Sequence, residues 1–176
     1  MDLEPLASTR PPAWIRPAVR EDVVDVAVRM RAADRAEIEA GLWDASPAAI
    51  ARGLLAPGRM VLAAGRARPE AILGIAWRGP RMVEAAMFAT DAFPDLALPL
   101  ARHVRRVLMP GLVAAGVARA ECRSAEGHVA AHRWLALLGA APEALLTDCG
   151  RHRGRFVQFA WTLSRLAPRT ETARCA

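Results

Sequence analysis

Apolar residues recur at helical spacing through the first third of the chain. After a short apolar strand at Trp14–Ala18, the interval Arg20–Met30 carries apolar residues three or four positions apart, which predicts an amphipathic helix. Small apolar and charged residues alternate over Ala32–Leu42 and predict a second helix. Ser46 followed by Pro47 is a typical helix start, an N-cap residue with proline in the first turn. The pattern therefore predicts one strand followed by three helical segments.

The apolar spacing changes after residue 59. Three short apolar runs follow, at Met60–Gly65, Ala71–Arg78 and Met82–Thr90. They are separated by Arg68-Pro69-Glu70 and Gly79-Pro80, which are turn-forming sequences. We expect three strands in an antiparallel meander.

The remainder of the chain alternates between helix and strand. The interval Leu96–Ala115 carries an apolar stripe and predicts a long helix, kinked near Pro110. A strand is expected next, then a helix that ends at Gly139, then a β-hairpin around the turn Gly150–Gly154. The expected bounds of these later elements are Val117–Arg123, Glu126–Leu138, Ala144–Cys149 and Arg155–Leu163.

Length and composition favour a single folded domain. The chain has 176 residues, of which 53% are hydrophobic, enough for one well-buried core. We expect a disordered leader at 1–12, one domain at 13–166 and a flexible tail at 167–176. The leader lacks the basic and apolar regions of a secretory signal, and no apolar run reaches the roughly 20 residues of a membrane span.

Charge and cysteine content narrow the classes of function. The formal net charge is +6, and every basic residue other than histidine is arginine. This bias indicates the base composition of the genome as much as selection for nucleic-acid binding. Cys122, Cys149 and Cys175 are an odd set without a CxxC pair. This spacing argues against a disulfide framework and a zinc site, and favours an intracellular protein without a metal. Nucleic acid is therefore an unfavoured partner.

The order of the elements and several local sequences resemble the GNAT superfamily of N-acyltransferases. Ile15-Arg16-Pro17-Ala18 is similar to the GNAT opening strand. Arg133–Gly139, preceded by His128 and Ala131, is similar to the fourth-helix motif N-x-x-A-x-x-x-Y-x-x-x-G-F, and Phe156–Trp161 to the closing strand. The resemblance implies a GNAT-like α/β fold, a mixed and mostly antiparallel sheet flanked by helices, with acetyl-CoA or another acyl-CoA as cofactor in active members.

Three further segments resemble GNAT-like proteins of tailed bacteriophages, including a virion protein family of T7-like phages. They are Phe88-Ala89-Thr90-Asp91, the helix end Leu138-Gly139-Ala140, and Arg155–Phe159. This resemblance implies a virion-associated or interaction module with other phage proteins as partners. Its place would be the cytoplasm of a bacterial host or the phage particle.

The segment that matches the family's cofactor loop departs from the family's pattern. GNAT enzymes hold the cofactor pyrophosphate on backbone N–H groups of an R/Q-x-x-G-x-G/A loop, where glycine lets the backbone approach the phosphates. The matching stretch Thr90–Ala97 contains no glycine, Pro94 lacks an N–H, and Asp91 and Asp95 add negative charge. The sequence therefore predicts a degenerate acyl-CoA loop. If a cofactor binds, the resemblance places Phe88, Thr90, Asp91, Arg102 and Arg106 beside it.

The catalytic residues of the family are also incompletely matched. The tyrosine that protonates the leaving thiolate in many GNAT enzymes corresponds to Leu135, and the chain has no tyrosine. Cys122, Ser124 and His128 are the available substitutes, although such residues are more often core or capping groups. Glu84 is the candidate general base, and an ordinary exposed strand-end glutamate is the alternative.

Two hypotheses of function remain open. The first is a phage or prophage-type GNAT-fold protein that serves as an interaction module. The second is an active acyl-CoA N-acyltransferase acting on a protein or a small amine. An active enzyme should keep a V-shaped gap between the strands at Ala85–Ala89 and Arg119–Arg123, whereas Met87, Phe88 or Phe93 would fill it in a decayed one.

Overall fold

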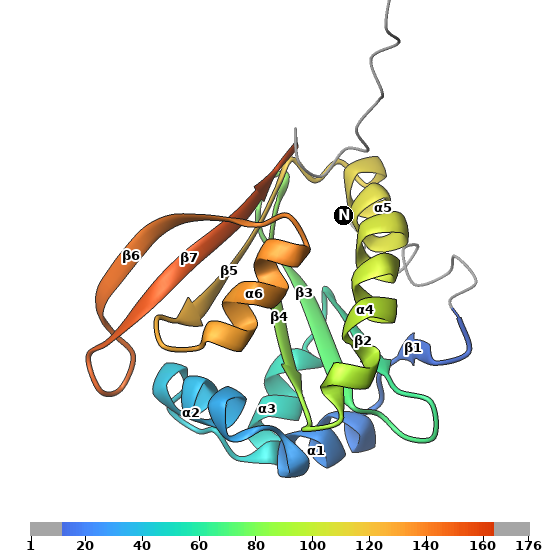
Figure 1. Cartoon of the computed structure of the whole chain (residues 1–176), viewed down its shortest axis with the longest axis horizontal. Coiled ribbons are helices and arrows are strands. Elements are labelled where there is room, and N and C mark those ends of the chain that lie inside the picture. The colour runs from blue at the N-terminus through green and yellow to red at the C-terminus, as the bar shows by residue number, and fades with distance from the viewer. Residues whose placement is uncertain (1–11, 164–176) are drawn as a thin grey trace, which may run out of the picture.

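The computed structural model describes residues 12–163 and forms one seven-stranded sheet with helices on both faces (Figure 1). The strand order is β1-β2-β3-β4-β5-β7-β6. The strands are β1 (Ile15–Pro17), β2 (Arg59–Ala64), β3 (Ala71–Gly79), β4 (Met82–Ala89), β5 (Arg119–Ala125), β6 (Ala141–Cys149) and β7 (Gly154–Thr162). The helices are α1 (Arg20–Arg29), α2 (Ala32–Gly41), α3 (Pro47–Leu54), α4 (Phe93–His103), the π-helical η2 (Val104–Leu108), α5 (Met109–Ala114) and α6 (Val129–Leu137).

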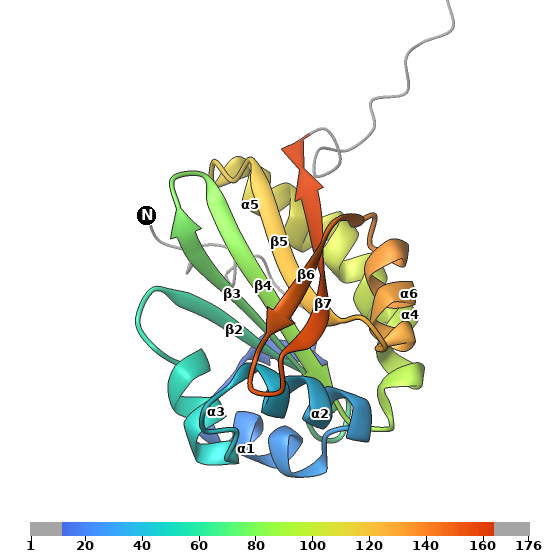
Figure 2. The ribbon, with the colours of Figure 1, turned by 90° about the vertical axis from the view of Figure 1, so that its left-hand side faces the viewer.

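Two apolar clusters lie on opposite faces of the sheet. Val23 and Val26 of α1 and Ile50 of α3 pack on β2 to β4 over one face, and α4, α5 and α6 pack over the other. Figure 2 shows the first face toward the viewer, with α1 to α3 at its lower end and no helix over its upper part. One face of the sheet is therefore only half covered.

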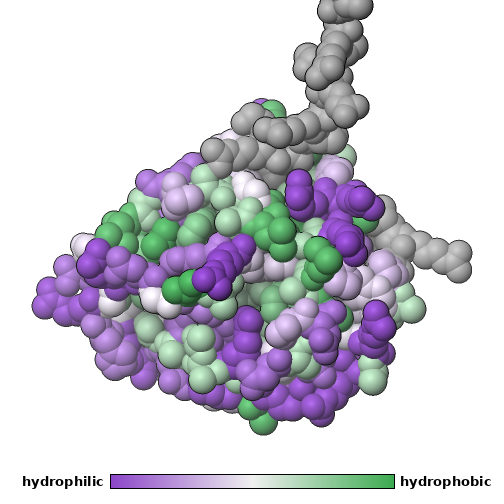
Figure 3. Space-filling view, in the orientation of Figure 1, coloured by the Kyte–Doolittle hydropathy of each residue, from purple (hydrophilic) through white to green (hydrophobic). Residues whose placement is uncertain are grey.

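The opposite face carries the helices and a mixed surface. Leu98 of α4 and Val129 and Leu137 of α6 are exposed there. Figure 3, a quarter turn from Figure 2, shows a broken band of apolar residues interrupted by hydrophilic ones on the side of the molecule that Figure 1 faces.

The long helix predicted over Leu96–Ala115 is three consecutive segments. It begins three residues earlier, at Phe93, and ends at Ala114. Pro99 and Pro110 have no N–H to donate, and the π-helical turn η2 lies between them. The predicted irregularity is present, but it begins at Val104 rather than at Pro110.

The sheet splits between β4 and β5. These strands pair in parallel only over Met82–Glu84 and Arg119–Glu121, and beyond these residues they no longer pair with each other. Antiparallel pairing continues on the outer side of each strand, from β4 to β3 and from β5 to β7. The V-shaped gap is thus present, although the first three residues of β5 are paired and do not border it as the sequence led us to expect.

The predicted fold class, a mixed α/β fold with a mostly antiparallel sheet, is confirmed. Gly139 has a φ of 88°, which explains why α6 stops where the sequence indicates. Residues 1–11 of the leader expected at 1–12, the tail expected at 167–176 and Cys175 lie outside the described residues. No helix between residues 12 and 163 is both long and apolar enough to cross a bilayer.

Candidate ligand cavity and its polar latch

The split between β4 and β5 opens into a cavity of about 680 Å³. Its lining comes from both faces of the sheet: Gly74 and Ala86 border it on the half-covered face, and Leu108 and Trp134 border it on the face of α4 to α6. Because residues from both faces line one space, the cavity passes through the sheet. Its volume lies within the range of small-molecule sites.

Two carboxylates of α2 bridge the wide end of the split. The Ala89 N–H at the end of β4 donates to Asp34 Oδ2 at 2.8 Å. At the end of β5, the Ala125 N–H and the Ser124 hydroxyl donate to Glu37 Oε2 at 2.7 and 2.8 Å. Each splayed strand end therefore obtains from a side chain the acceptor that a neighbouring strand would otherwise supply.

His128, the residue before α6, lies between these two carboxylates. Its Nδ1 is 3.0 Å from Glu37 Oε2, and its Nε2 is 3.2 Å from Asp34 Oδ1 without hydrogen-bonding geometry. Arg31 donates to both oxygens of Asp34. We call this buried network the polar latch, and its members are Arg31, Asp34, Glu37, Ser124 and His128.

The pKa of Glu37 reflects its partners in the polar latch. Burial raises this pKa, but the hydrogen bonds from His128, the Ala125 N–H and Ser124 outweigh burial and hold it below its ordinary value of 4.5. A lowered pKa in the folded state means that the carboxylate stabilises the fold above about pH 4.5. That contribution is lost as the pH falls through the lowered value.

Glu37→Gln is therefore expected to reduce the free energy of unfolding at pH 7 by about 1–3 kcal/mol, because three donors lose an ionised acceptor. The difference in the free energy of unfolding between this variant and the wild type should become smaller as the pH falls below about 4.5. Urea titrations of both proteins between pH 3 and pH 7 measure this. Asp22, Asp25 and Glu70 also have lowered pKa values, and the comparison between the two proteins removes their contribution. A difference that stays constant with pH would contradict the assignment.

The three residues proposed from the sequence as catalytic all line the cavity. Glu84 lies where the split begins and forms an ion pair with Arg78 at 3.4 Å. Burial, together with nearby carboxylates, raises the pKa of the Cys122 thiol to about 12, which makes it a poor proton donor and a poor nucleophile at neutral pH. The Nδ1 of His128 already forms a hydrogen bond with Glu37 within the polar latch.

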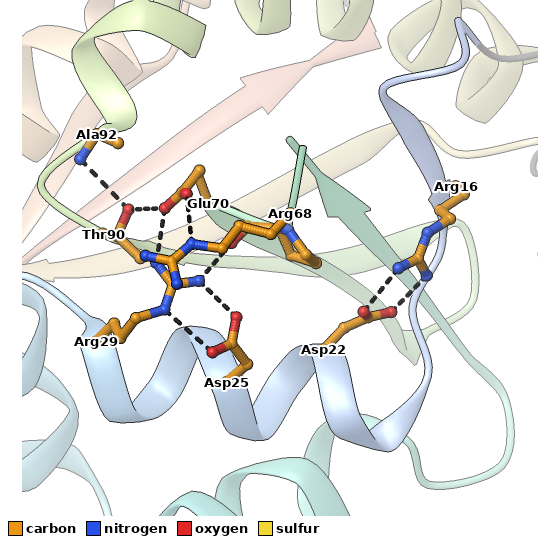
Figure 4. A network of polar contacts seen from close by, with 9 residues as sticks. Arg16, Asp22, Asp25, Arg29, Arg68, Glu70, Thr90 and Ala92 are labelled. Atoms are coloured by element: carbon orange, nitrogen blue, oxygen red, sulfur yellow. Dashed lines mark hydrogen bonds and ion pairs between the residues drawn. The ribbon is translucent and has the colours of Figure 1, made fainter. Parts of the chain in front are cut away.

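The loop that leads from β4 into α4 uses most of its own backbone donors. The N–H groups of Phe93 and Asp95 donate to the carbonyls of Thr90 and Ala92, and the Ala92 N–H donates to the Thr90 hydroxyl oxygen. Figure 4 shows the Thr90 hydroxyl between Ala92 and Glu70, to which it donates. Pro94 has no N–H, and α4 begins without a side-chain cap, with Asp95 inside its first turn.

An aromatic contact lies directly after this loop. The Phe93 ring packs edge-on against Trp134 of α6, with ring centroids 5.1 Å apart. The Arg31 guanidinium lies 4.9 Å from the centre of the same Phe93 ring. Phe93 thus joins α4 to α6 and to the polar latch.

The residues proposed beside the cofactor do not gather at one place. Phe88 is buried in the cluster under α1 and α3 and also borders the cavity. Thr90 is buried in the loop, and Asp91 is exposed. Arg102 and Arg106 are exposed on α4 and η2, and none of these four residues lines the cavity. Their role as cofactor contacts stays a prediction.

Sequence reasoning missed the α2 side of the site. Arg31, Asp34 and Glu37 are spaced by three residues, which places them on one side of a helix. Charged residues in an N-terminal helix are usually solvated, and the strand-end partners of Asp34 and Glu37 are more than 50 residues away in sequence. The regular spacing was the available indication. No group of three or more His, Cys, Asp or Glu side chains within residues 12–163 is arranged to hold a metal ion.

Comparison of the sequence with known families and proteins finds nothing: no family model matches, and no curated protein does. Comparison of the fold does find similar structures. A variant of the spermidine N-acetyltransferase SpeG from Vibrio cholerae has a TM-score of 0.67 at 12% identity, covering 89% of this chain and 99% of its own.

Two structures with cofactor are also similar. YncA from Salmonella typhimurium, solved with acetyl-CoA, has a TM-score of 0.61 at 16% identity, with 92% of this chain and 98% of its own covered. Mycobacterium smegmatis RimJ, in complex with CoA-disulfide, has a TM-score of 0.64 at 17% identity, with 88% and 83% covered. At these identities the likeness establishes a GNAT-like fold, which the sequence resemblance implied, and the phage relationship stays a prediction.

Proposed function

We propose that this chain is a GNAT-fold binding module whose cavity takes a ligand other than acyl-CoA. The observation that carries the proposal is the loop after β4. Four of its N–H groups, those of Thr90, Ala92, Phe93 and Asp95, already donate within the protein, and Pro94 has none. A pyrophosphate needs several converging free N–H groups, so the residues present do not fit it.

The charges around the loop support the same proposal. Asp91 and Asp95 are exposed beside the start of α4, where a pyrophosphate would meet carboxylates instead of backbone donors. Phe93 fills the space between α4 and α6 by packing on Trp134. Opening this contact to admit a cofactor would require loss of a buried aromatic pair, which costs about 1 kcal/mol beyond its buried area.

Titration of the purified protein with CoA and acetyl-CoA tests the proposal. We expect no heat of binding and no rise in melting temperature up to millimolar ligand, because a bound ligand would stabilise the folded state in proportion to its affinity. Dissociation constants in the micromolar range for either compound would contradict the proposal, since they would require the loop to hold the pyrophosphate.

The second candidate function is that of an acyl-CoA N-acyltransferase, and the open split favours it. The edges of β4 and β5 are unpaired beyond Glu84 and Glu121, and the cavity reaches through the sheet between them. Glu84 borders this space and would serve as the general base. Thiol release from acetyl-CoA with spermidine or an N-terminal alanine peptide tests this, with Glu84→Gln inactive and the exposed Glu126→Gln active as control.

Association with a virion rests on the sequence resemblance to phage proteins. It agrees with a binding module, and it stays a prediction. Co-purification of the full chain with phage structural proteins would test it directly.

A further inference from the structure

The interior of the cavity is apolar, whereas its rim on the half-covered face of the sheet is charged. Met87, Leu108, Trp134 and Leu138 line its inner part. Such a lining receives an apolar ligand body, because contact with apolar carbon releases water from both surfaces.

The charges at the cavity do not cancel completely. Each lining carboxylate already has a partner within the protein, through the contacts Asp34–Arg31, Glu37–His128, Asp44–Arg52 and Glu84–Arg78. The side chains of two lining arginines, Arg59 and Arg123, form no ion pair or hydrogen bond with any residue between 12 and 163. The unused charges of the site are therefore both positive.

These two arginines lie on the same side of the sheet. Four residues form one row across β2, β3, β4 and β5, and residues in one row lie on the same face of the sheet. They are Arg59, Ala76, Glu84 and Glu121. Arg123 follows Glu121 by two residues, and alternate residues of a strand share a face. Their strand neighbours Met60 and Cys122 belong to the cluster on the face of α4 to α6. Both arginines are exposed and therefore stand on the opposite, half-covered face, on either side of a floor of small residues that includes Ala76 and Ala86.

A largely exposed aromatic residue also lines the cavity. Trp43 lines the cavity, yet 91% of its surface is exposed. Its backbone is held, because the Arg151 guanidinium of the β6–β7 turn donates to the carbonyls of Leu42 and Trp43. A fixed backbone with an exposed indole places an apolar surface at the mouth of the cavity.

We propose that the cavity binds an amphipathic organic anion, an aliphatic or aromatic body carrying one carboxylate, which enters from the half-covered face. Its apolar body occupies the split, its carboxylate meets Arg123 on β5, and Trp43 covers the part nearest to solvent. Arg59 lies more than three strand spacings away, beyond roughly 14 Å, and adds a weaker attraction. The proposal rests on the proposed function only in requiring that acyl-CoA does not fill the same space.

Binding of decanoate to the full chain tests this proposal, with uncharged decanol and cationic decyltrimethylammonium as matched probes. Calorimetry is expected to give decanoate at least about tenfold tighter binding than either, as a charge-assisted hydrogen bond to arginine requires. Tryptophan fluorescence should change on binding. The change should be smaller in Trp43→Phe, because Trp134 and Trp161 also line the cavity and keep their own contribution. Equal affinity for decanoate and decanol would overturn the proposal.

Substitution of single arginines tests where the carboxylate of decanoate binds. Arg123→Gln is expected to weaken decanoate binding about tenfold and to leave decanol unaffected, whereas Arg59→Gln weakens decanoate about threefold or less. Arg105→Gln, an exposed arginine of η2 outside the cavity, is the control and should bind as the wild type. Unchanged decanoate affinity in Arg123→Gln would also overturn the proposal.

A parallel titration with CoA separates this inference from the proposed function. CoA binding together with intact decanoate selectivity would refute the proposed function alone. Absence of decanoate binding without any CoA binding would refute this inference alone. An acidic peptide that binds where decanoate does not would assign the two arginines to a protein partner and overturn the small-molecule proposal.

Discussion

Replacing Asp34 with alanine is expected to reduce the free energy of unfolding by about 3–5 kcal/mol. Only 3% of Asp34 is exposed, and its carboxylate accepts from the Ala89 N–H and pairs with Arg31 at 2.8 Å. The alanine variant leaves a buried donor and a cation without partners, and it frees the end of β4. For a domain of this size the melting temperature should fall by about 10 °C, measurable by calorimetry and urea denaturation.

Two further variants make this prediction specific. Asp34→Asn keeps an acceptor for the Ala89 N–H but not the charge opposite Arg31, so its loss should be about half as large. Asp91→Ala removes an exposed carboxylate and should change stability by less than about 0.5 kcal/mol. A loss below about 1 kcal/mol for Asp34→Ala would show that the polar latch does not hold the split strands.

Gly65→Ala is expected to reduce the free energy of unfolding by about 3 kcal/mol. A Cβ at this position would lie 1.8 Å from the Arg68 carbonyl oxygen, which is backbone and cannot turn aside. The turn between β2 and β3 would have to move. That turn carries Glu70, which accepts from the Thr90 hydroxyl and fixes the loop before α4.

The matched control for Gly65 is Gly53, in the last turn of α3. A Cβ there meets nothing within 4 Å, so Gly53→Ala should raise stability by about 0.5–1 kcal/mol through the higher helix propensity of alanine. Equilibrium urea unfolding of both variants measures the contrast. A wild-type stability for Gly65→Ala would mean that the turn relaxes without cost.

The elements of this fold could be predicted closely from the sequence because each follows from local pattern. The meander appears as three apolar runs with turn residues between them, and Gly139 stops α6 with its positive φ. The start of β6 was expected at Ala144 and is at Ala141, since Pro142 sits on this outermost strand where it need not donate.

The site was less predictable because its contacts join distant segments. Glu84, Cys122 and His128 were proposed from their chemistry and their expected place in the fold, and all three line the cavity. Asp34 and Glu37 could not be found in this way, since their partners Ala89 and Ser124 are 55 and 87 residues away. The hydrogen bonds that the loop N–H groups already donate could not be predicted from the sequence, which showed only the absence of glycine, the proline and the two aspartates.

The position of α2 has a consequence for how the chain acquires its structure during synthesis. This early helix contacts β5 through Glu37 and the β6–β7 turn through Gly150, and its following loop receives Arg151 across 109 residues. These pairings cannot form until nearly the whole domain has left the ribosome. We therefore expect β2 to β4 to assemble early and the docking of α2 on the C-terminal hairpin to come last, since contacts of large sequence separation form slowly. The cavity would then be completed in the final step of folding.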